Sequence, residues 1–488
     1  MGFKADISFL QKLTMGATAT RAAVEYLTSL GFAPLELERY STSNKIWSTK
    51  VKRLRLADLL CARTGVRIEV RAKSDLQIKM SDSPTNPERR WDSGLRDDDL
   101  VALVACDGGA NVRVRGAPVF FAVSDLRSTA HLAKPGRPKS ASEGAERDLT
   151  WPSTVPSDDG EVVEVTADRI RVRMRSGRNQ SYQLKGKTAY VRVGDEFAGE
   201  SSILAGAVPR IVDPMSLLQR KWSPMKDLQS TNAADRYAAA KALASDKAGA
   251  ASSVRGLLDK ALDAEDEPRT ALEIAGALAR LNADRGFEYL ADATRREGDS
   301  FPSYLRMEAV LILSELPDAR SASALDAVAG SADLKGDELR QAAVWGLGRR
   351  GVRSYAHVAK YIADEEDDVA LHAIAALGQD APREVVEKLA RILVESSDAR
   401  ARAGASEALR LIGSSDVAEV LVALSGSDVS PWALATLGRL PKAVLSGLQL
   451  PPEVVRAIEP VSILSEPNNW LVARTIMTDF QFLLQQDL

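Results

Sequence analysis

The most regular pattern in the chain is a recurrence of short Ala- and Leu-rich segments between residues 227 and 450. Each segment has apolar residues at helical spacing and closes on a Leu, and most contain an Arg ahead of several small residues. The closing leucines are spaced 35, 35, 34, 30, 32 and 28 residues apart and are Leu243, Leu278, Leu313, Leu347, Leu377, Leu409 and Leu437. This period predicts stacked pairs of helices that bury their apolar faces only against neighbouring pairs.

Residues 1–132 mix helical and strand patterns. Apolar residues at helical spacing predict one helix over residues 8–30, which Gly31 ends. Strand-like runs lie at residues 35–38, 56–61, 67–80, 99–106 and 118–126. In the run 67–80 the odd positions are charged or polar and the even positions are mostly apolar, so it predicts one long strand with a charged face.

Residues 158–212 read as short strands separated by turns, which favours a small all-β barrel or sandwich. Arg169, Arg171, Arg173 and Arg175 alternate there with apolar residues, so strand geometry places all four on one face. Residues 161–192 hold eight Lys and Arg against three Asp and Glu. The face is either an ordinary solvated surface or a basic ribbon that contacts a phosphate backbone.

Length and composition set the domain organisation. A chain of 488 residues predicts two to four domains, and 45% apolar with 27% charged residues is typical of globular protein. We expect a multidomain chain with five parts: an α/β domain, a connecting segment, a β module, a helical repeat region, and a tail with a terminal helix. The connecting segment is rich in Pro, Gly and Ser and is either a linker or a segment lying over a surface. These parts are assigned to residues 1–132, 133–157, 158–212, 227–450 and 451–488, respectively.

Charge and residue counts exclude several function classes. The net charge of −3 means that any nucleic-acid affinity depends on local patches, and two Cys and three His argue against disulfide frameworks, zinc sites and Ser-His-Asp hydrolases. His357 and His372 are expected to be ordinary helix residues, and Trp345 and Trp432 to be core. No apolar run approaches the length of a membrane helix and the amino end does not resemble a signal peptide, so we expect a cytoplasmic protein without a membrane partner.

Two acidic residues suggest chemistry near the amino end. Asp58 and Glu69 are expected on adjacent strands, where two carboxylates can share a hard cation such as Mg²⁺. Arg71 and Lys73 project from the same face as Glu69. A metal ion beside fixed cations is what hydrolysis of a phosphodiester requires.

This arrangement resembles the PD-(D/E)XK nuclease superfamily, which includes restriction endonucleases and Holliday-junction resolvases. The similarity lies in a helix, a strand with Asp58, a turn, and a strand carrying Glu69-Val-Arg71-Ala-Lys73, and it covers about 125 residues. It implies a mixed sheet completed by the later strands, Mg²⁺ or Mn²⁺ held by Asp58 and Glu69, and a further acidic ligand at Glu25. Arg71 stands where the family has Lys, and Arg acts only as a fixed cation. Lys73 can take that role if the site is shifted. Many nucleases of this fold act as homodimers.

The repeats resemble HEAT-type helical repeats, which implies an elongated solenoid able to bind a protein partner. We expect the Arg of each repeat to pair with an Asp of a neighbouring repeat. Residues 41–80 hold ten Lys and Arg against three Asp and Glu, which is typical of phosphate binding, although a solubilising surface would look the same. The predicted nucleic-acid contacts are Asn44, Lys45, Trp47, Lys50, Lys52, Arg53, Arg55, Lys79, Arg171, Arg173 and Arg175.

The leading interpretation is a metal-dependent endonuclease acting on DNA, in which Asp58, Glu69, Arg71 and Lys73 are catalytic and the solenoid positions substrate or partner. By analogy of domain combination, its setting would be bacterial defence or DNA processing. Two alternatives remain open: an inactive nuclease-like DNA-binding or sensing scaffold, and a HEAT-repeat adaptor for protein interactions.

Overall fold

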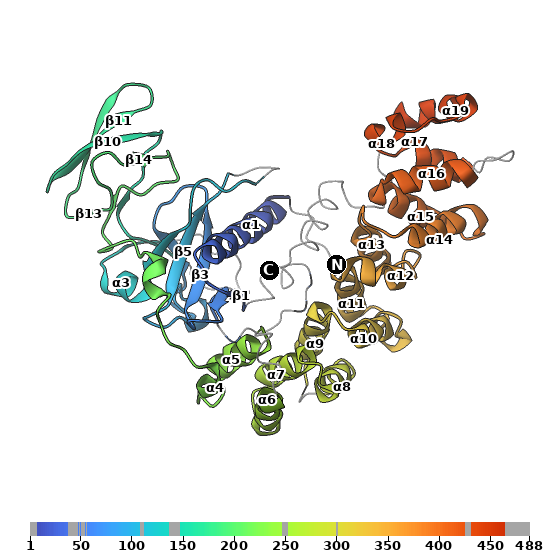
Figure 1. Cartoon of the computed structure of the whole chain (residues 1–488), viewed down its shortest axis with the longest axis horizontal. Helices are drawn as coiled ribbons and strands as arrows, with labels where there is room; N and C mark the ends of the chain where they lie inside the picture. The colour runs from blue at the N-terminus through green and yellow to red at the C-terminus, as the bar shows by residue number, and fades with distance from the viewer. Residues whose placement is uncertain are drawn as a thin grey trace. The chain divides into compact units, whose positions relative to one another are not determined.

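The computed structural model describes residues 7–37, 47, 49, 54, 56–107, 112–135, 147–245, 252–298, 301–424 and 431–463 (Figure 1). The chain divides into two compact units. The sheet unit comprises residues 8–42, 52–261 and 488, and the array unit comprises residues 1–7, 43–51 and 262–487. Trp47 and Thr49 therefore belong to the array unit, although the sheet unit surrounds them in sequence.

The sheet unit is built on a five-stranded mixed sheet in the order β1-β2-β3-β5-β6 (Figure 1). Its strands are β1 (Pro34–Glu36), β2 (Leu59–Cys61), β3 (Arg67–Lys73), β5 (Leu100–Ala105) and β6 (Val119–Ala122). Only the β3–β5 pair is parallel, and the other three pairs are antiparallel. β5 is buried along its whole length, which is typical of a central strand covered on both faces.

Each face of this sheet has its own apolar core. On one face, Ala23 and Leu27 of α1 (Ile7–Ser29) pack with Ile68 and Val104. On the other face, Trp91 and Trp151 pack with the β5 side chains that project to that face. The predicted helix 8–30 is present, and Gly31 follows it with a φ of 93°, a conformation that favours glycine.

The single strand predicted over residues 67–80 is wrong. β3 stops at Lys73, and β4 (Lys79–Asp82) belongs to a separate antiparallel sheet of order β4-β8-β7. The carboxylate of Asp75 accepts a hydrogen bond from the backbone of Gln77 at 3.1 Å, which turns the chain between the two strands. The alternation continues through this turn because Leu76, Ile78 and Met80 all enter one core.

The segment expected to be a linker contributes strands within its described residues. β7 (Leu132–Pro135) and β8 (Arg147–Thr150) pair with each other, and β9 (Ser153–Thr154) joins a third sheet. Polar composition there therefore does not mean the absence of strands, although β7 is exposed along its whole length.

The β module consists of two antiparallel sheets that share one core. One sheet has the order β12-β11-β10-β14 and the other has the order β13-β15-β9. The strands are β10 (Gly160–Val165), β11 (Arg169–Met174), β12 (Asn179–Gln183), β13 (Thr188–Ala189), β14 (Glu196–Phe197) and β15 (Ala205–Gly206). Along β11, Ile170 and Val172 are buried and the arginines between them are exposed, as the alternation predicts.

Helices account for most of the described residues beyond the β module (Figure 1). Within the sheet unit, α3 (Val123–Ser128) follows β6. The later helices are α4 (Pro224–Asp227), α5 (Ala233–Ser245), α6 (Ser252–Ala264), α7 (Pro268–Arg280), α8 (Asp284–Ala293), α9 (Ser303–Glu315), α10 (Ala319–Ala329), α11 (Glu338–Arg349), α12 (Tyr355–Val358), α13 (Asp367–Ala376), α14 (Arg383–Glu395), α15 (Ala399–Ile412), α16 (Ser415–Leu424), α17 (Pro431–Gly438), α18 (Lys442–Ser446) and α19 (Pro452–Ile463). None of the helices in these described ranges is both long and apolar enough to cross a bilayer.

In the array unit the helices alternate between two layers. The first-helix layer holds α7, α9, α11, α13, α15 and α17, in which successive members contact each other, and the second helices α8, α10, α14 and α16 pack against it. Close approach depends on small residues, because a Cβ at Gly276 of α7 would come within 2.7 Å of Ile312 in α9.

Arginines link successive repeats, as expected. Arg306 pairs with Asp337 of the next repeat at 3.3 Å, and Arg340 pairs with Asp364 at 2.6 Å. Arg269 instead pairs with Glu267 at the start of its own helix. Both members of the Arg340 pair are nearly buried, so these contacts are more than a solvated charge pattern.

His372 makes the stability of the array depend on pH. It is fully buried in α13, and burial lowers its pKa to about 4. The unfolded chain, with an ordinary His pKa near 6.5, therefore binds a proton before the folded chain does, and stability falls as the pH drops from about 6.5 toward 4.

We predict that lowering the pH from 7 to 5 costs the native chain about 2 kcal/mol of unfolding free energy more than it costs the variant His372→Gln, which cannot titrate there. Urea unfolding followed by circular dichroism at both pH values measures this difference. Equal pH dependence of the two chains would contradict it.

Candidate functional site

The strand register brings Asp58 and Glu69 together. β2 and β3 are antiparallel with Leu59 opposite Ile68, and extending that register by one residue places Asp58 opposite Glu69. Directly opposed residues of an antiparallel pair point to the same face. The backbone therefore places Asp58 and Glu69 on one face of the sheet, as the predicted carboxylate pair requires.

Asp58 has a structural contact as well. Its Oδ2 accepts a hydrogen bond from the backbone N–H of Val70 at 2.7 Å. β2 begins only at Leu59, so the carboxylate takes the place of a strand carbonyl at this end of the ladder. Any role of Asp58 as a ligand has to coexist with this bond.

Glu69 is paired with Arg71, a cation on its own strand. The Nη2 of Arg71 lies 2.7 Å from the Oε1 of Glu69, whose side chain is only 14% exposed. Residues two apart on a strand share a face, which explains the pairing. The guanidinium partly neutralises the carboxylate charge that a metal ion would need.

Lys73 lies at the end of β3, where its ammonium donates a hydrogen bond to the carbonyl oxygen of Lys79 at the start of β4. Burial lowers its pKa to about 8, helped by the nearby charges of Arg71 and Lys79. A substantial fraction of this amine is therefore neutral slightly above physiological pH, which is a property of lysines that move protons.

The donor set fits a divalent ion only in part. Two opposed carboxylates can hold Mg²⁺ when water or phosphate oxygens complete its shell. However, the described ranges contain no group of three or more His, Cys, Asp or Glu suited to a metal ion. Glu25 is exposed on α1, whose buried residues Ala23 and Leu27 face the sheet, so it does not join Asp58 and Glu69.

Trp47, predicted to contact nucleic acid, is placed differently. Its side chain is 1% exposed and packs edge-on against Trp345, with ring centroids 5.3 Å apart. A buried indole cannot stack on a base, so this prediction is corrected. The predicted contacts Asn44, Lys45, Lys50, Lys52, Arg53 and Arg55 lie outside the described residues.

The remaining basic positions are exposed but interleaved with acids. Lys79 pairs with Asp148 at 2.9 Å, and Arg171 bonds Glu164 at 3.1 Å. Arg175 lies 3.4 Å from Asp159, and Arg173 is opposite Glu161 in the strand register. These pairs favour the solvated-surface interpretation of the β11 ribbon, because its positive charge is partly neutralised.

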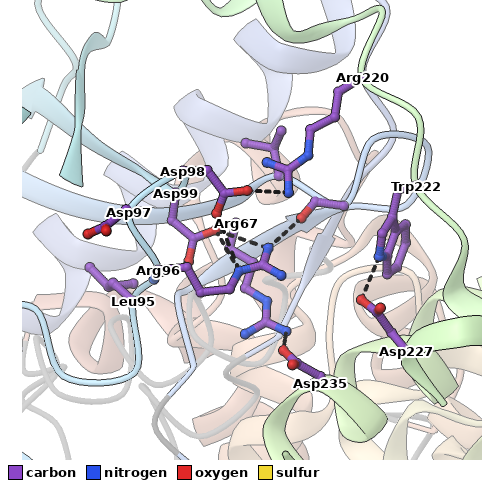
Figure 2. A network of polar contacts seen from close by, with 12 residues as sticks. Arg67, Leu95, Arg96, Asp97, Asp98, Asp99, Arg220, Trp222, Asp227 and Asp235 are labelled. Carbon is purple, nitrogen blue, oxygen red and sulfur yellow. Dashed lines mark hydrogen bonds and ion pairs between the residues drawn. The ribbon is translucent and has the colours of Figure 1, made fainter. Parts of the chain in front are cut away.

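Sequence reasoning missed a network of charged side chains in the sheet unit, in which Arg67 and Asp99 are buried (Figure 2). Arg67, assigned to the charged strand face, is 2% exposed and forms an ion pair with Asp235 of α5. Beside it, Arg96 donates to the carbonyl oxygen of Gly65 at 2.9 Å and pairs with Asp99 at 3.1 Å. Burial raises the pKa of Asp99 even though Arg96 opposes the shift.

The same network fixes the segment that leads from the β module to the helices. Arg220 pairs with Asp98 at 2.5 Å, and the indole N–H of Trp222 donates to Asp227 at 2.7 Å (Figure 2). Gly65, with a φ of 66°, lies against the indole of Trp222, where a Cβ would collide. The only sequence signal was the glycine in the turn, and it does not reveal these partners.

Comparison with known proteins bears on the repeats. Residues 355–438 match the family of HEAT repeats. The C-terminal region contains HEAT repeats. This confirms the expectation for the part of the array that holds Leu377, Leu409 and Leu437. The match does not extend to the sheet unit, and no curated protein matches the chain.

Several solved structures are similar to parts of the chain. The complex of CpcE and CpcF of phycocyanin lyase from Nostoc sp. PCC7120 is 19% identical, covers 50% of this chain and 95% of its own, and has a TM-score of 0.26. Human deoxyhypusine hydroxylase in complex with glycerol is 14% identical, covers 46% of this chain and 82% of its own, and has a TM-score of 0.21. Kap121p is 12% identical, covers 55% of this chain and 34% of its own, and has a TM-score of 0.29. Likeness at this level carries no argument about function.

Proposed function

We propose that the chain is a protein-binding scaffold whose HEAT-repeat array holds a partner protein. The observation that carries this proposal is the array itself, because stacked repeats joined by buried ion pairs such as Arg340–Asp364 present an extended, rigid surface. The neutralised carboxylate of Glu69 favours binding over catalysis.

The rigidity of the array suits recognition. Successive first helices contact each other, and α8, α10, α14 and α16 pack against their layer, so the surface does not need to be ordered when a partner binds. A pre-ordered surface loses less conformational entropy on association. A scaffold of this kind needs a partner and no metal.

Photo-crosslinking in cells tests the scaffold. We predict that a photoreactive residue at Val352 or at Val455, two exposed valines of the array, crosslinks to a discrete protein, whereas one at Val193, an exposed valine of the β module, yields at least tenfold less. Mass spectrometry of the crosslinked band identifies the partner. Equal yields from Val193, or none from the array, would contradict the proposal.

A second candidate is a metal-dependent nuclease, and the register that opposes Asp58 to Glu69 favours it. In this candidate Asp58 and Glu69 would hold Mg²⁺ or Mn²⁺, and the ion would supply positive charge at a scissile phosphate. Arg71 would turn from Glu69 toward the phosphate as a fixed cation. Lys73, with its lowered pKa, accepts or donates a proton at its Nζ.

Nicking of supercoiled plasmid in Mg²⁺ or Mn²⁺ tests this candidate. Glu69→Gln should lower the rate at least roughly tenfold, as expected for loss of a metal ligand, and Arg71→Lys should raise it because the competing guanidinium is removed. Glu25→Gln, at the exposed position on α1, is the matched control and should leave the rate unchanged. Salt-sensitive DNA binding without nicking in any variant would refute the nuclease and leave a DNA-binding scaffold.

A further inference from the structure

Two first helices of the array are buried on every side. In α11 each residue from Leu339 to Gly348 is buried, and in α13 each residue from Val369 to Ala376 is buried. A helix that faces solvent on one side shows an exposed stripe at every turn. The side of α11 and α13 away from the second helices is therefore covered.

Trp47 supplies part of this cover. Its ring lies 5.3 Å from Trp345 of α11 at an angle of 88°, and 6.3 Å from His372 of α13 in a stacked orientation. Arg349 adds a cation–π contact to Trp345, with its guanidinium carbon 5.0 Å from the ring centroid. An edge-to-face pair of indoles is favourable beyond the burial of the two rings.

A backbone contact accompanies the aromatic anchor. The N–H of Thr49 donates to the Oε2 of Glu338 at 2.7 Å, across 289 residues of sequence. An aromatic side chain in a pocket and a main-chain hydrogen bond two residues further on are the two elements with which domains read extended peptides. The array therefore contacts Trp47 and Thr49 in the way that a peptide-binding domain contacts a peptide.

The segment around Trp47 is basic in sequence. Residues 45–55 contain five Lys and Arg and no acidic residue. The residue of α11 that accepts the Thr49 N–H, Glu338, is acidic. A carboxylate at this position favours a basic segment over an acidic one.

We propose that the first-helix face at Trp345, His372 and Glu338 is a recognition site for an extended basic protein segment anchored by a Trp. The chain's own Trp47 fills it, and a partner's segment of the same chemistry displaces Trp47 when it binds. This inference rests on the proposed scaffold function and names the chemistry by which the array selects its partner. Tethering gives the resident segment a high effective concentration, so it acts as a built-in competitor.

Fluorescence polarisation with a labelled peptide of residues 43–55 tests the site. The full-length variant Trp47→Ala, with an emptied pocket, should bind this peptide at least tenfold more tightly than the native chain does. The same peptide with Ala in place of its Trp should not bind. Trp432→Ala, which removes a half-buried Trp of α17 outside the site, is the matched control and should behave like the native chain.

A second variant guards against a folding defect. Glu338→Gln added to Trp47→Ala should weaken peptide binding about fivefold while circular dichroism stays unchanged, because the amide is a weaker acceptor for the Thr49 N–H. If Trp47→Ala does not fold, the milder variant Trp47→Leu takes its place, because it also removes the indole that fills the site and should bind the peptide more tightly than the native chain does.

Two outcomes overturn the inference. One is a folded Trp47→Ala chain that does not bind the peptide, and the other is equal binding of the peptide that lacks Trp, which would indicate charge attraction alone. Crosslinking from Val352 reports the scaffold function separately. A crosslinked partner without peptide binding would refute this site and leave the scaffold, whereas peptide binding without any crosslinked partner would refute the scaffold.

Discussion

The buried ion pair between Arg67 and Asp235 is the constraint on which the sheet unit depends. Arg67 opens β3 and is almost completely buried, so its charge has to be compensated inside the protein. Asp235 supplies that compensation from the first turn of α5. A buried guanidinium that loses its carboxylate is far more costly than an exposed ion pair that opens. The position of α5 against the sheet is therefore specified by charge as well as by apolar packing.

The same anchor affects the candidate site. With the start of β3 fixed, its register with β2 sets Asp58 opposite Glu69, while Arg71 and Lys73 follow at intervals of two residues. The backbone geometry suits a carboxylate pair, but Arg71 forms an ion pair with Glu69 and partly neutralises its charge. The array holds a different kind of site, in which Trp345 and His372 receive an aromatic side chain from far along the sequence.

Sequence periodicity predicted what depends on local pattern. The helix ended by Gly31 and the HEAT repeats marked by their leucines follow from spacing alone. Alternation in β11 correctly assigned its faces. It failed over residues 67–80, because period-2 patterning tells which side chains share a face and not which strand lies alongside. The burial of Arg67 and Trp47 could not be foreseen, since each depends on a partner that is distant in sequence.

A double-mutant cycle on Arg67 and Asp235 tests the central claim most directly. Urea unfolding of the native chain, Arg67→Met, Asp235→Leu and the double variant gives the coupling free energy. We predict that Asp235→Leu alone costs about 3–5 kcal/mol, because it removes the ion-pair partner of the buried Arg67, and that adding Arg67→Met recovers most of this loss. Additive effects, with a coupling below about 0.5 kcal/mol, would show that the pair does not fix the sheet unit.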